Sequence, residues 1–311
     1  MKHAIVDIGS NSMRLTLYET DEASFRILFK EKIMAGLAGY VENDVLTKEG
    51  IECACAALLE FKETLEALEI ENVSVFATAS LRNIENTNEA IIAIESATGY
   101  QIEVISGEEE AMYGYYGAMY EHHITNGAIV DIGGASTEIV ILENGKPITA
   151  VSHGIGSLSL YRECVKKILP GHGSYERLND EINKNINKKN LHDLNSISKM
   201  VCVGGTARAA LNIAGKLFSL PENSSVITSQ QFKKMCSLLF KADKTAINII
   251  LKLEPDRIHT LIPGLMILRQ ITELLDVNEI TVSRYGVREG YLCQKILKSK
   301  PKRTRTRKTV S

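Results

Sequence analysis

Apolar positions recur along this chain with two different periods, one typical of helices and one typical of strands. From residue 48 to 69 they return every three to four positions, which predicts a helix with one buried face. Short β-branched runs bounded by small residues predict strands between such helices. The same criteria predict further helices at 86–98, 157–169, 174–189, 229–240 and 263–275, and strands at 101–105 and 279–283. Strands that alternate with helices indicate an α/β protein with layered packing.

One stretch of the sequence occurs twice. The segment AIVDIGSNSMRLTLYE at 4–19 returns 124 residues later as AIVDIGGASTEIVILE at 128–143, and each copy predicts a β-hairpin with a Gly-containing turn. A second pair, VFATASLR at 75–82 and VCVGGTAR at 201–208, repeats at a spacing of 126. Two correspondences at nearly one spacing indicate duplicated halves. We expect the two hairpin turns to face each other across a cleft and to bind the same anion.

Both turns carry residues that suit a bound phosphate. Glycine lets the backbone approach a ligand closely, and small polar side chains add donors without bulk. Asp7 and Asp131 stand at the strand ends beside the turns, where a carboxylate can hold Mg²⁺ directly or through its waters. An Asp-x-Gly sequence is also ordinary turn chemistry, but its duplication favours a functional role. The predicted phosphate-binding residues are Gly9, Ser10, Asn11 and Ser12 in the first turn, and Gly133, Gly134, Ala135 and Ser136 in the second.

Two arginines follow small-residue loops at equivalent places in the halves. Arg82 and Arg208 each lie at the end of a repeated segment. A guanidinium group beside a phosphate cleft can contact two oxygens at once, so both are candidate ligands. Either could instead form a surface ion pair.

An acidic cluster follows in SGEEEA at 106–111. Ser106 and Glu109 have the spacing of a capping box, so part of the cluster has a structural role at a helix start. Three consecutive glutamates on a helix fan over roughly 200°, and they cannot all face one cleft. A helix N-terminus lowers a carboxylate pKa, which would make a weak base. Residue chemistry alone does not choose among Glu108, Glu109 and Glu110.

Composition and charge fit a globular chain of two domains. The 311 residues are 44% hydrophobic and 24% charged. The net charge of -2 is uneven, because 298–308 holds seven Lys or Arg and no acid, while the remainder has 29 basic against 38 acidic residues, or -9. We interpret 298–311 as a disordered basic tail that contacts a polyanion or is simply solvated. No run reaches the roughly 20 apolar residues of a membrane span, and the sequence opens directly on a strand, so we expect a cytoplasmic protein.

Seven short motifs together carry a family resemblance over nearly the whole chain. In order they are VDIGSNSMRL, ATASLR, SGEEEA, VDIGGASTE, VGGTAR, PGL at 263–265 and YGVREGYL at 285–292. This set resembles the Ppx/GppA family of exopolyphosphatases and guanosine pentaphosphate phosphohydrolases. The resemblance implies an α/β fold of two similar lobes, of the actin, hexokinase and DnaK-like ATPase (ribonuclease H-like) superfold, with an interlobe cleft. We expect an N-terminal lobe at 1–123 and a C-terminal lobe at 124–297, followed by the basic tail.

The resemblance also assigns roles to particular residues. It implies that Glu110 is the catalytic base, that Arg82 is the family's loop arginine and that Asp131 and Glu138 are the metal-linked acids, with Asp7 beside them. Ala135 stands where the family usually has a third glycine, and ATASLR replaces the commoner order ATSALR. Long family members append helical domains after the two lobes, whereas this sequence continues into its basic tail, as expected of the short form.

We therefore expect a Mg²⁺- or Mn²⁺-dependent exopolyphosphatase that removes terminal phosphates from short polyphosphate chains, with conversion of pppGpp to ppGpp as a second reaction. The expected partners are polyphosphate and guanosine penta- or tetraphosphate, with no membrane, no specific nucleic acid, and a homodimeric assembly. The alternatives are a pppGpp-specific phosphohydrolase, a non-catalytic sensor of the alarmone or of polyphosphate, and a small-molecule kinase of the same superfold. The intact set of Glu110, Asp131 and Glu138 favours hydrolysis.

Overall fold

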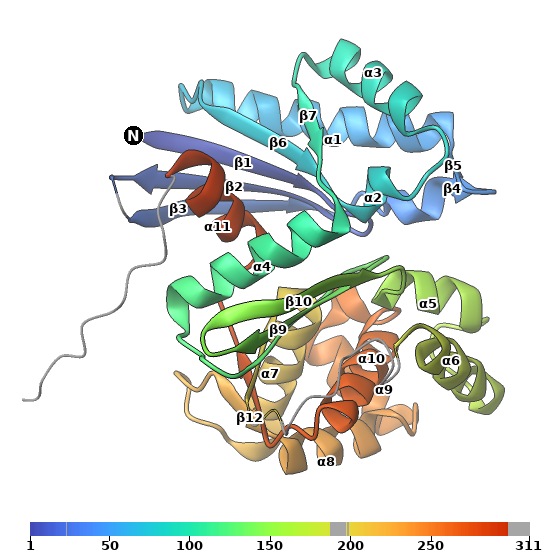
Figure 1. Ribbon diagram of the computed structural model, residues 1–311. Helices are drawn as coiled ribbons and strands as arrows, with labels where there is room; N and C mark the ends of the chain where they lie inside the picture. The colour runs from blue at the N-terminus through green and yellow to red at the C-terminus, as the bar shows by residue number, and fades with distance from the viewer. Residues whose placement is uncertain (23, 187–196, 198, 298–311) are drawn as a thin grey trace, which may run out of the picture.

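The computed structural model describes residues 1–22, 24–186, 197 and 199–297, and it shows two lobes stacked one above the other (Figure 1). Each lobe is built on one mixed β-sheet with helices packed against it. The basic tail predicted at 298–311 lies outside the described residues. Among the helices that the structure describes, none is both long and apolar enough to cross a bilayer.

The first lobe contains a five-stranded sheet in the order β3-β2-β1-β6-β7. β1 and β2 form the predicted hairpin, with Asp7 opposite Arg14 near the turn. β6 runs parallel to β1, and β7 runs parallel to β6, so helices connect them. The strands are β1 (Lys2–Ile8), β2 (Met13–Thr20), β3 (Phe25–Ile33), β6 (Val73–Ala77) and β7 (Ile102–Val104), with a small ribbon of β4 (Val41–Glu42) and β5 (Val45–Leu46).

Helix α1 (Lys48–Ala67) covers the first sheet because it has one continuous apolar face. Its buried side chains include Leu58, Phe61 and Leu65, which recur at helical spacing and belong to the same core cluster as β1 and β2. Burying a side chain of this size contributes about 1.5–3 kcal/mol. The smaller elements of this lobe are η1 (Leu37–Tyr40), α2 (Ala79–Arg82) and α3 (Thr87–Thr98).

The second lobe repeats the first strand arrangement around a larger core. Its sheet has the order β10-β9-β8-β11-β13-β12, so the part β10-β9-β8-β11 corresponds to β3-β2-β1-β6. In the second hairpin Asp131 lies opposite Glu138. The strands are β8 (Gly127–Ile132), β9 (Thr137–Glu143), β10 (Lys146–His153), β11 (Lys199–Val203), β12 (Val226–Thr228) and β13 (Glu279–Val282). The helices are α5 (Ser157–Cys164), α6 (His172–Asn185), α7 (Gly204–Phe218), α8 (Ser229–Leu239), α9 (Lys244–Leu253), η3 (Pro255–Arg257) and α10 (Leu261–Leu274).

The predicted fold class of two similar α/β lobes is confirmed, while several element boundaries differ. The helix predicted at 157–169 ends at Cys164, where the chain turns to an extended conformation at Val165. The helix predicted at 174–189 begins at His172 and ends at Asn185, because the chain is extended at Ile186. Helices α7 and α9 and strands β3 and β10 were not predicted.

Two helices cross between the lobes. Helix α4 (Gly107–Glu121) buries Ala111, Tyr115 and Ala118 against strands of the second sheet. Helix α11 (Val287–Tyr291) and the following turn η4 (Leu292–Ile296) come after the last strand of the second lobe, yet Tyr291 and Leu292 join a cluster with residues of the first lobe. The sequence-based boundaries at 123/124 and 297/298 remain predictions.

Glycines allow α4 and α11 to pack with their backbones nearly in contact. A side chain at Gly117 would collide with the Gly286 carbonyl, and one at Gly290 would collide with the Tyr113 carbonyl. Positions 117 and 290 therefore require glycine, because any side chain there would prevent the two backbones from packing this closely. The crossing holds the start of α11 beside the space between the lobes.

The predicted capping box at the start of α4 is present. The Ser106 hydroxyl accepts a bond of 3.1 Å from the Glu109 N–H, and the Glu109 carboxylate accepts one of 2.8 Å from the Ser106 N–H. We expect Ser106→Ala to lower the free energy of unfolding by about 1 kcal/mol in urea denaturation. Glu108→Ala, at an exposed position of the same turn, is the control and should change it by less than about 0.5 kcal/mol. Equal losses in both variants would contradict this role.

Candidate active site

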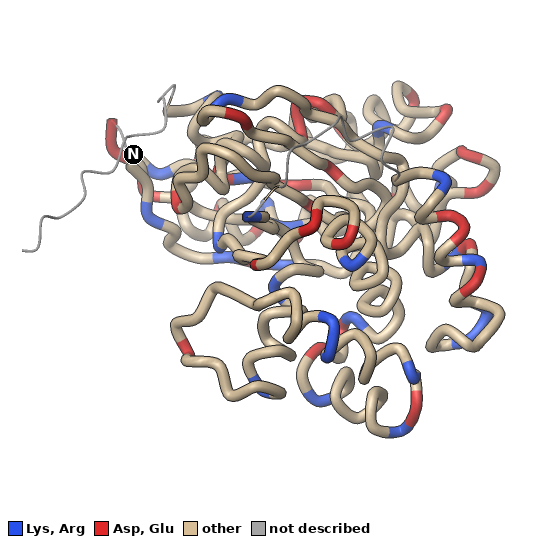
Figure 2. The backbone as a smooth tube through the Cα atoms, turned by 60° about the horizontal axis from the view of Figure 1, so that its bottom comes forward, with Lys and Arg blue, Asp and Glu red and all other residues tan. Residues whose placement is uncertain are grey.

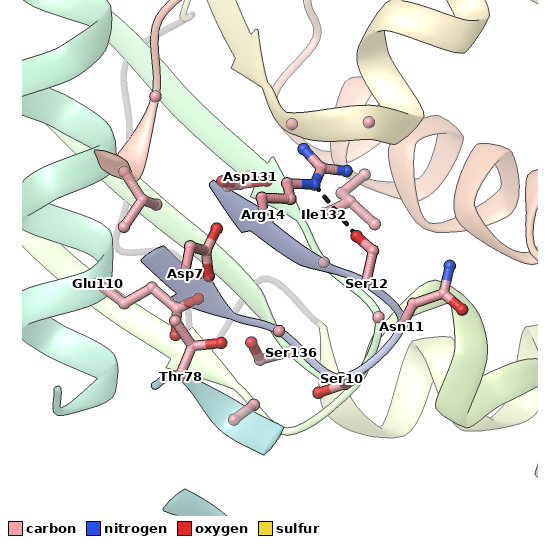
Figure 3. A pocket seen from close by; sticks show the side chains of 18 of the residues that line it. Asp7, Ser10, Asn11, Ser12, Arg14, Thr78, Glu110, Asp131, Ile132 and Ser136 are labelled. Carbon is pink, nitrogen blue, oxygen red and sulfur yellow. Dashed lines mark hydrogen bonds between the residues drawn. The ribbon is translucent and has the colours of Figure 1, made fainter. Parts of the chain in front are cut away.

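A cavity of about 130 Å³ lies between the lobes, where the two hairpin turns meet (Figure 3). This volume is below the roughly 300–1,000 Å³ typical of pockets for drug-sized ligands. The N-terminus of α7 and the start of α11 complete its walls. The lining residues from the predicted set are Asp7, Gly9, Ser10, Asn11, Ser12, Glu110, Asp131, Gly133, Gly134, Ala135, Ser136 and Arg208.

The two turns approach each other closely. A Cβ atom at Gly134 would lie 3.3 Å from the Ser10 Cβ and 3.4 Å from the Asn11 Cβ. Each turn is also anchored from behind by backbone bonds, because the Ser10 carbonyl accepts a bond of 2.9 Å from Ala38 and the Gly134 carbonyl accepts one of 2.8 Å from Leu158. The structure therefore brings one small-residue turn from each lobe to a single cavity, as the repeat suggested.

A glycine at the start of α7 makes room for Asp131. Gly204 has a φ of +83°, and a side chain there would collide with the Asp131 carboxylate. This position therefore requires glycine for both its backbone conformation and its contact. The VGGTAR motif thus places a helix N-terminus directly beside the carboxylate at the end of β8.

Half-buried Asp7 and Asp131 and buried Glu110 line the cavity, and Figure 3 shows Asp7 and Glu110 directed into the same part of it. Burial raises the pKa of Asp7, and it raises the pKa of Asp131 to about 6. For Asp131 the charges of Arg208 and Arg14 act in the opposite direction. Carboxylates that are costly to ionise together would be stabilised by a cation or by proton uptake.

Glu110 combines burial with an ion pair. Burial raises its pKa to about 7, although the charge and hydrogen bond of Arg82 lower it and Asp131 and Asp7 raise it. The Arg82 Nη1 lies 2.8 Å from the Glu110 Oε2 and also donates to the Ile105 carbonyl. The depression expected from the helix N-terminus is therefore wrong, because desolvation is the larger effect. A carboxylate with a pKa near neutrality is a competent general base.

Two predicted site residues stand behind the cavity wall. Arg82 is absent from the lining residues and contacts the cavity through Glu110. Glu138 is buried, and its Oε1 accepts a bond of 2.7 Å from the Ser152 hydroxyl. Burial raises the Glu138 pKa, and the charges of Glu110 and Asp131 raise it further.

The predicted metal-linked acids do not form a preformed metal cluster. Across the described ranges, no three His, Cys, Asp or Glu side chains are arranged to hold a metal ion. Asp7 and Asp131 nevertheless provide two carboxylates on the cavity wall. Mg²⁺ is commonly held by one or two carboxylates together with waters and substrate phosphates. The donor set of these two residues fits that arrangement and would require the substrate to complete it.

Five arginines also line the cavity. Over the rest of the molecule, basic and acidic residues are interspersed along both lobes (Figure 2). The pKa of Arg14 is lowered to about 10, mainly by burial and in addition by the neighbouring charges of Arg288 and Arg208. Burial also lowers the pKa of Arg208 and of Arg257. Mutual repulsion among guanidinium groups would be relieved by a bound polyanion. The cavity arginines are Arg14, Arg208, Arg257, Arg284 and Arg288.

Four of these arginines were not predicted as site residues. Arg14 occupies the hairpin position that corresponds to Glu138 in the repeat, so a basic and an acidic residue alternate at one equivalent place. This difference between the two copies of the repeat is visible in the sequence and could have identified Arg14 as a site residue. Arg288 lies in the motif YGVREGYL, which contributed to the family resemblance but predicted no site residue. Arg257 and Arg284 reach the cavity only through the tertiary fold.

The sequence matches a family model described as the Ppx/GppA phosphatase family over residues 16–299. A putative exopolyphosphatase of Haemophilus influenzae is 27% identical, over 93% of this chain and 90% of that protein. A guanosine-5'-triphosphate,3'-diphosphate pyrophosphatase of Vibrio vulnificus is 29% identical over 93% of this chain. This chain spans only 58% of the length of the Vibrio protein.

Solved structures of similar shape cover almost the entire chain. A Ppx/GppA family member from Aquifex aeolicus superimposes with a TM-score of 0.76 at 25% identity, covering 96% of this chain and 98% of that one. An exopolyphosphatase from Cytophaga hutchinsonii superimposes with a TM-score of 0.84 at 19% identity, over the same shares. The second likeness shows the fold alone.

Proposed function

The chain belongs to the Ppx/GppA phosphatase family, and on that premise we propose that it is a phosphoanhydride hydrolase that removes terminal phosphates from inorganic polyphosphate. The observation that carries this proposal is the cavity between the lobes, where two small-residue turns, five arginines and a buried glutamate converge. Turns and arginines of this kind bind phosphate oxygens. The glutamate supplies the base that hydrolysis requires.

In the proposed mechanism the two turns and Arg208 hold the terminal phosphate between the lobes. Glu110 accepts a proton from the attacking water and orients that water in line with the bond that breaks. Arg82 holds the Glu110 carboxylate through their 2.8 Å ion pair. Glu138 lies on β9 opposite Asp131 of β8, and its bond to Ser152 fixes it to β10. Phosphoryl transfer has a loose transition state, so positioning and charge stabilisation supply most of the catalysis.

A divalent cation, Mg²⁺ or Mn²⁺, completes this proposal. Asp7 and Asp131 would hold it, and the cation would neutralise charge on the phosphate oxygens during transfer. Glu138 points its Oε1 at Ser152 rather than into the cavity, so we place it behind Asp131 as a supporting residue. We also propose that the protein forms a homodimer and is located in the cytoplasm.

Guanosine pentaphosphate is a second candidate substrate, with ppGpp as the product. Its support is the resemblance to the Vibrio pyrophosphatases, whose names specify this nucleotide and which match at 28–29% identity. A non-catalytic sensor is less well supported, because Glu110 keeps a pKa near neutrality inside the cavity. A kinase of the same superfold is disfavoured by the family match.

We expect short chains to be preferred and long chains to be shortened distributively. The cavity of about 130 Å³ can grip only the last few phosphates, and the chain up to residue 297 carries 29 basic against 38 acidic residues. A negatively charged body does not hold a long polyanion between cleavages. Gel analysis of partially digested polyphosphate should therefore show a ladder of progressively shorter chains. Full-length polymer beside free orthophosphate, without intermediates, would contradict this prediction.

A further inference from the structure

The motif YGVREGYL places one arginine in the cavity with a defined set of contacts. The Arg288 Nη1 donates a bond of 3.0 Å to the Thr16 hydroxyl, and its Nε lies 3.9 Å from the Asp7 Oδ2. The Arg288 side chain is only 12% exposed. It is therefore largely shielded from solvent by the first hairpin and the start of α11, while it still lines the cavity.

The next residue, Glu289, is held by the same strand that holds Arg288. The Tyr18 hydroxyl donates a bond of 2.9 Å to the Glu289 Oε1, and the Gly286 N–H donates one of 2.9 Å to the Glu289 Oε2. Glu289 is 2% exposed. Thr16 and Tyr18 are two positions apart on β2, so their side chains share one face of the sheet. This face therefore binds both members of the Arg288–Glu289 pair.

The pKa of Arg288 is shifted in the opposite direction from the pKa values of its neighbours in the cavity. Burial lowers its pKa, but the nearby groups Glu289, Tyr18 and Asp7 raise it by more. The pKa values of Arg14 and Arg208 are lowered instead. Glu289 compensates a buried positive charge that would otherwise be repelled by the other arginines.

We propose that Arg288 contacts the phosphate of the substrate, and that Glu289 and Tyr18 are positioning residues that hold Arg288 in place for it. Helix α11, which follows the last strand of the second lobe, thus becomes part of the site because Arg288 and Glu289 are bonded to β2. This inference rests on the proposed phosphohydrolase function for its kinetic readout. Its binding readout, described below, does not depend on turnover.

The chain offers a matched pair of tyrosines for the test. The Tyr291 hydroxyl donates a bond of 2.8 Å to the Glu103 Oε2, so it also joins the α11 segment to the first lobe, but its bond goes to Glu103, whereas that of Tyr18 goes to Glu289. We expect Tyr18→Phe to lower kcat/KM about tenfold, which corresponds to about 1.4 kcal/mol. We expect Tyr291→Phe to change kcat/KM less than about twofold, with a similar shift of the unfolding midpoint in both variants. Equal kinetic effects in the two variants would overturn the proposal.

A double-mutant cycle separates positioning from a general structural role. Glu289→Gln should lower kcat/KM about tenfold in the wild-type background and less than about twofold in an Arg288→Ala background. An undiminished effect without Arg288 would show that Glu289 acts on the fold alone and would refute the proposal. The same variants should weaken orthophosphate binding, measured by calorimetry, in the same pattern. If the wild type cleaves no phosphoanhydride, the proposed function fails, and the binding cycle still decides whether Glu289 acts through Arg288.

Discussion

Replacing Glu110 with glutamine is expected to lower kcat by roughly 10² to 10⁴, the range for a positioned acid–base group, and to leave KM little changed. Glutamine keeps the shape of the side chain but cannot accept the proton of the attacking water. The Arg82 guanidinium would keep an oxygen partner in the amide, so the local structure should persist. Phosphate release from tripolyphosphate under saturating substrate is the measurement.

The pH dependence gives this variant a second signature. Burial raises the Glu110 pKa to about 7, and a base acts only when it is deprotonated, so wild-type kcat/KM should fall as the pH drops below about 7. This acidic decline should be absent in Glu110→Gln. Glu108→Gln, at an exposed position two residues earlier on the same helix, is the control and should behave as wild type. A Glu110→Gln variant with near wild-type kcat would remove Glu110 from the mechanism.

Removal of divalent metal is expected to abolish activity, and addition of Mg²⁺ or Mn²⁺ is expected to restore it. Asp7 and Asp131 line a cavity that also contains five arginines and that we propose binds polyphosphate. Because carboxylates and phosphates are both negatively charged, a cation is needed between them. Such a cation supplies several kcal/mol of charge stabilisation in the transition state. Phosphate release after exhaustive dialysis against EDTA, followed by metal titration, measures this requirement.

Two variants assign the metal requirement to particular residues. Asp131→Asn should raise the metal concentration needed for half-maximal activity, because it removes a charged ligand from the cavity wall. Arg82→Ala should raise it less, because Arg82 contacts the site only through Glu110. Activity that survives exhaustive chelation, or equal shifts in both variants, would contradict the assignment.

Much of the fold follows from local sequence patterns. The hairpins of each half, helix α1 and the capping box at Ser106 are encoded by neighbouring residues, and the structure contains them. Helix α7 was not predicted, because it begins with Gly204 and Gly205, which are weak helix formers. Strand β3 was also not predicted, although its side chains alternate between partly buried and exposed positions, as a half-covered edge strand does.

The site was predictable where it is built from the repeat and unpredictable where it depends on the tertiary fold. Arg82 and Arg208 occupy equivalent sequence positions, but Arg208 lines the cavity while Arg82 pairs with Glu110. Nothing in the local sequence distinguishes them. Arg288 reaches the cavity because α11 returns to the first lobe and docks on β2, an arrangement that no local pattern encodes. The raised pKa of Glu110 likewise arises from burial between the lobes.

The proposal that water attacks the terminal phosphorus is tested most directly by tracing the oxygen of water into the products of tripolyphosphate cleavage. In water enriched in ¹⁸O, we predict that label appears in the released orthophosphate and not in the remaining pyrophosphate, because the water oriented by Glu110 attacks the terminal phosphorus in line. Mass spectrometry of both products at early times, with Glu110→Gln as the comparison, gives the answer. Label in the pyrophosphate, or no orthophosphate release by the wild-type protein with Mg²⁺ present, would contradict hydrolysis by attack of water on the terminal phosphorus.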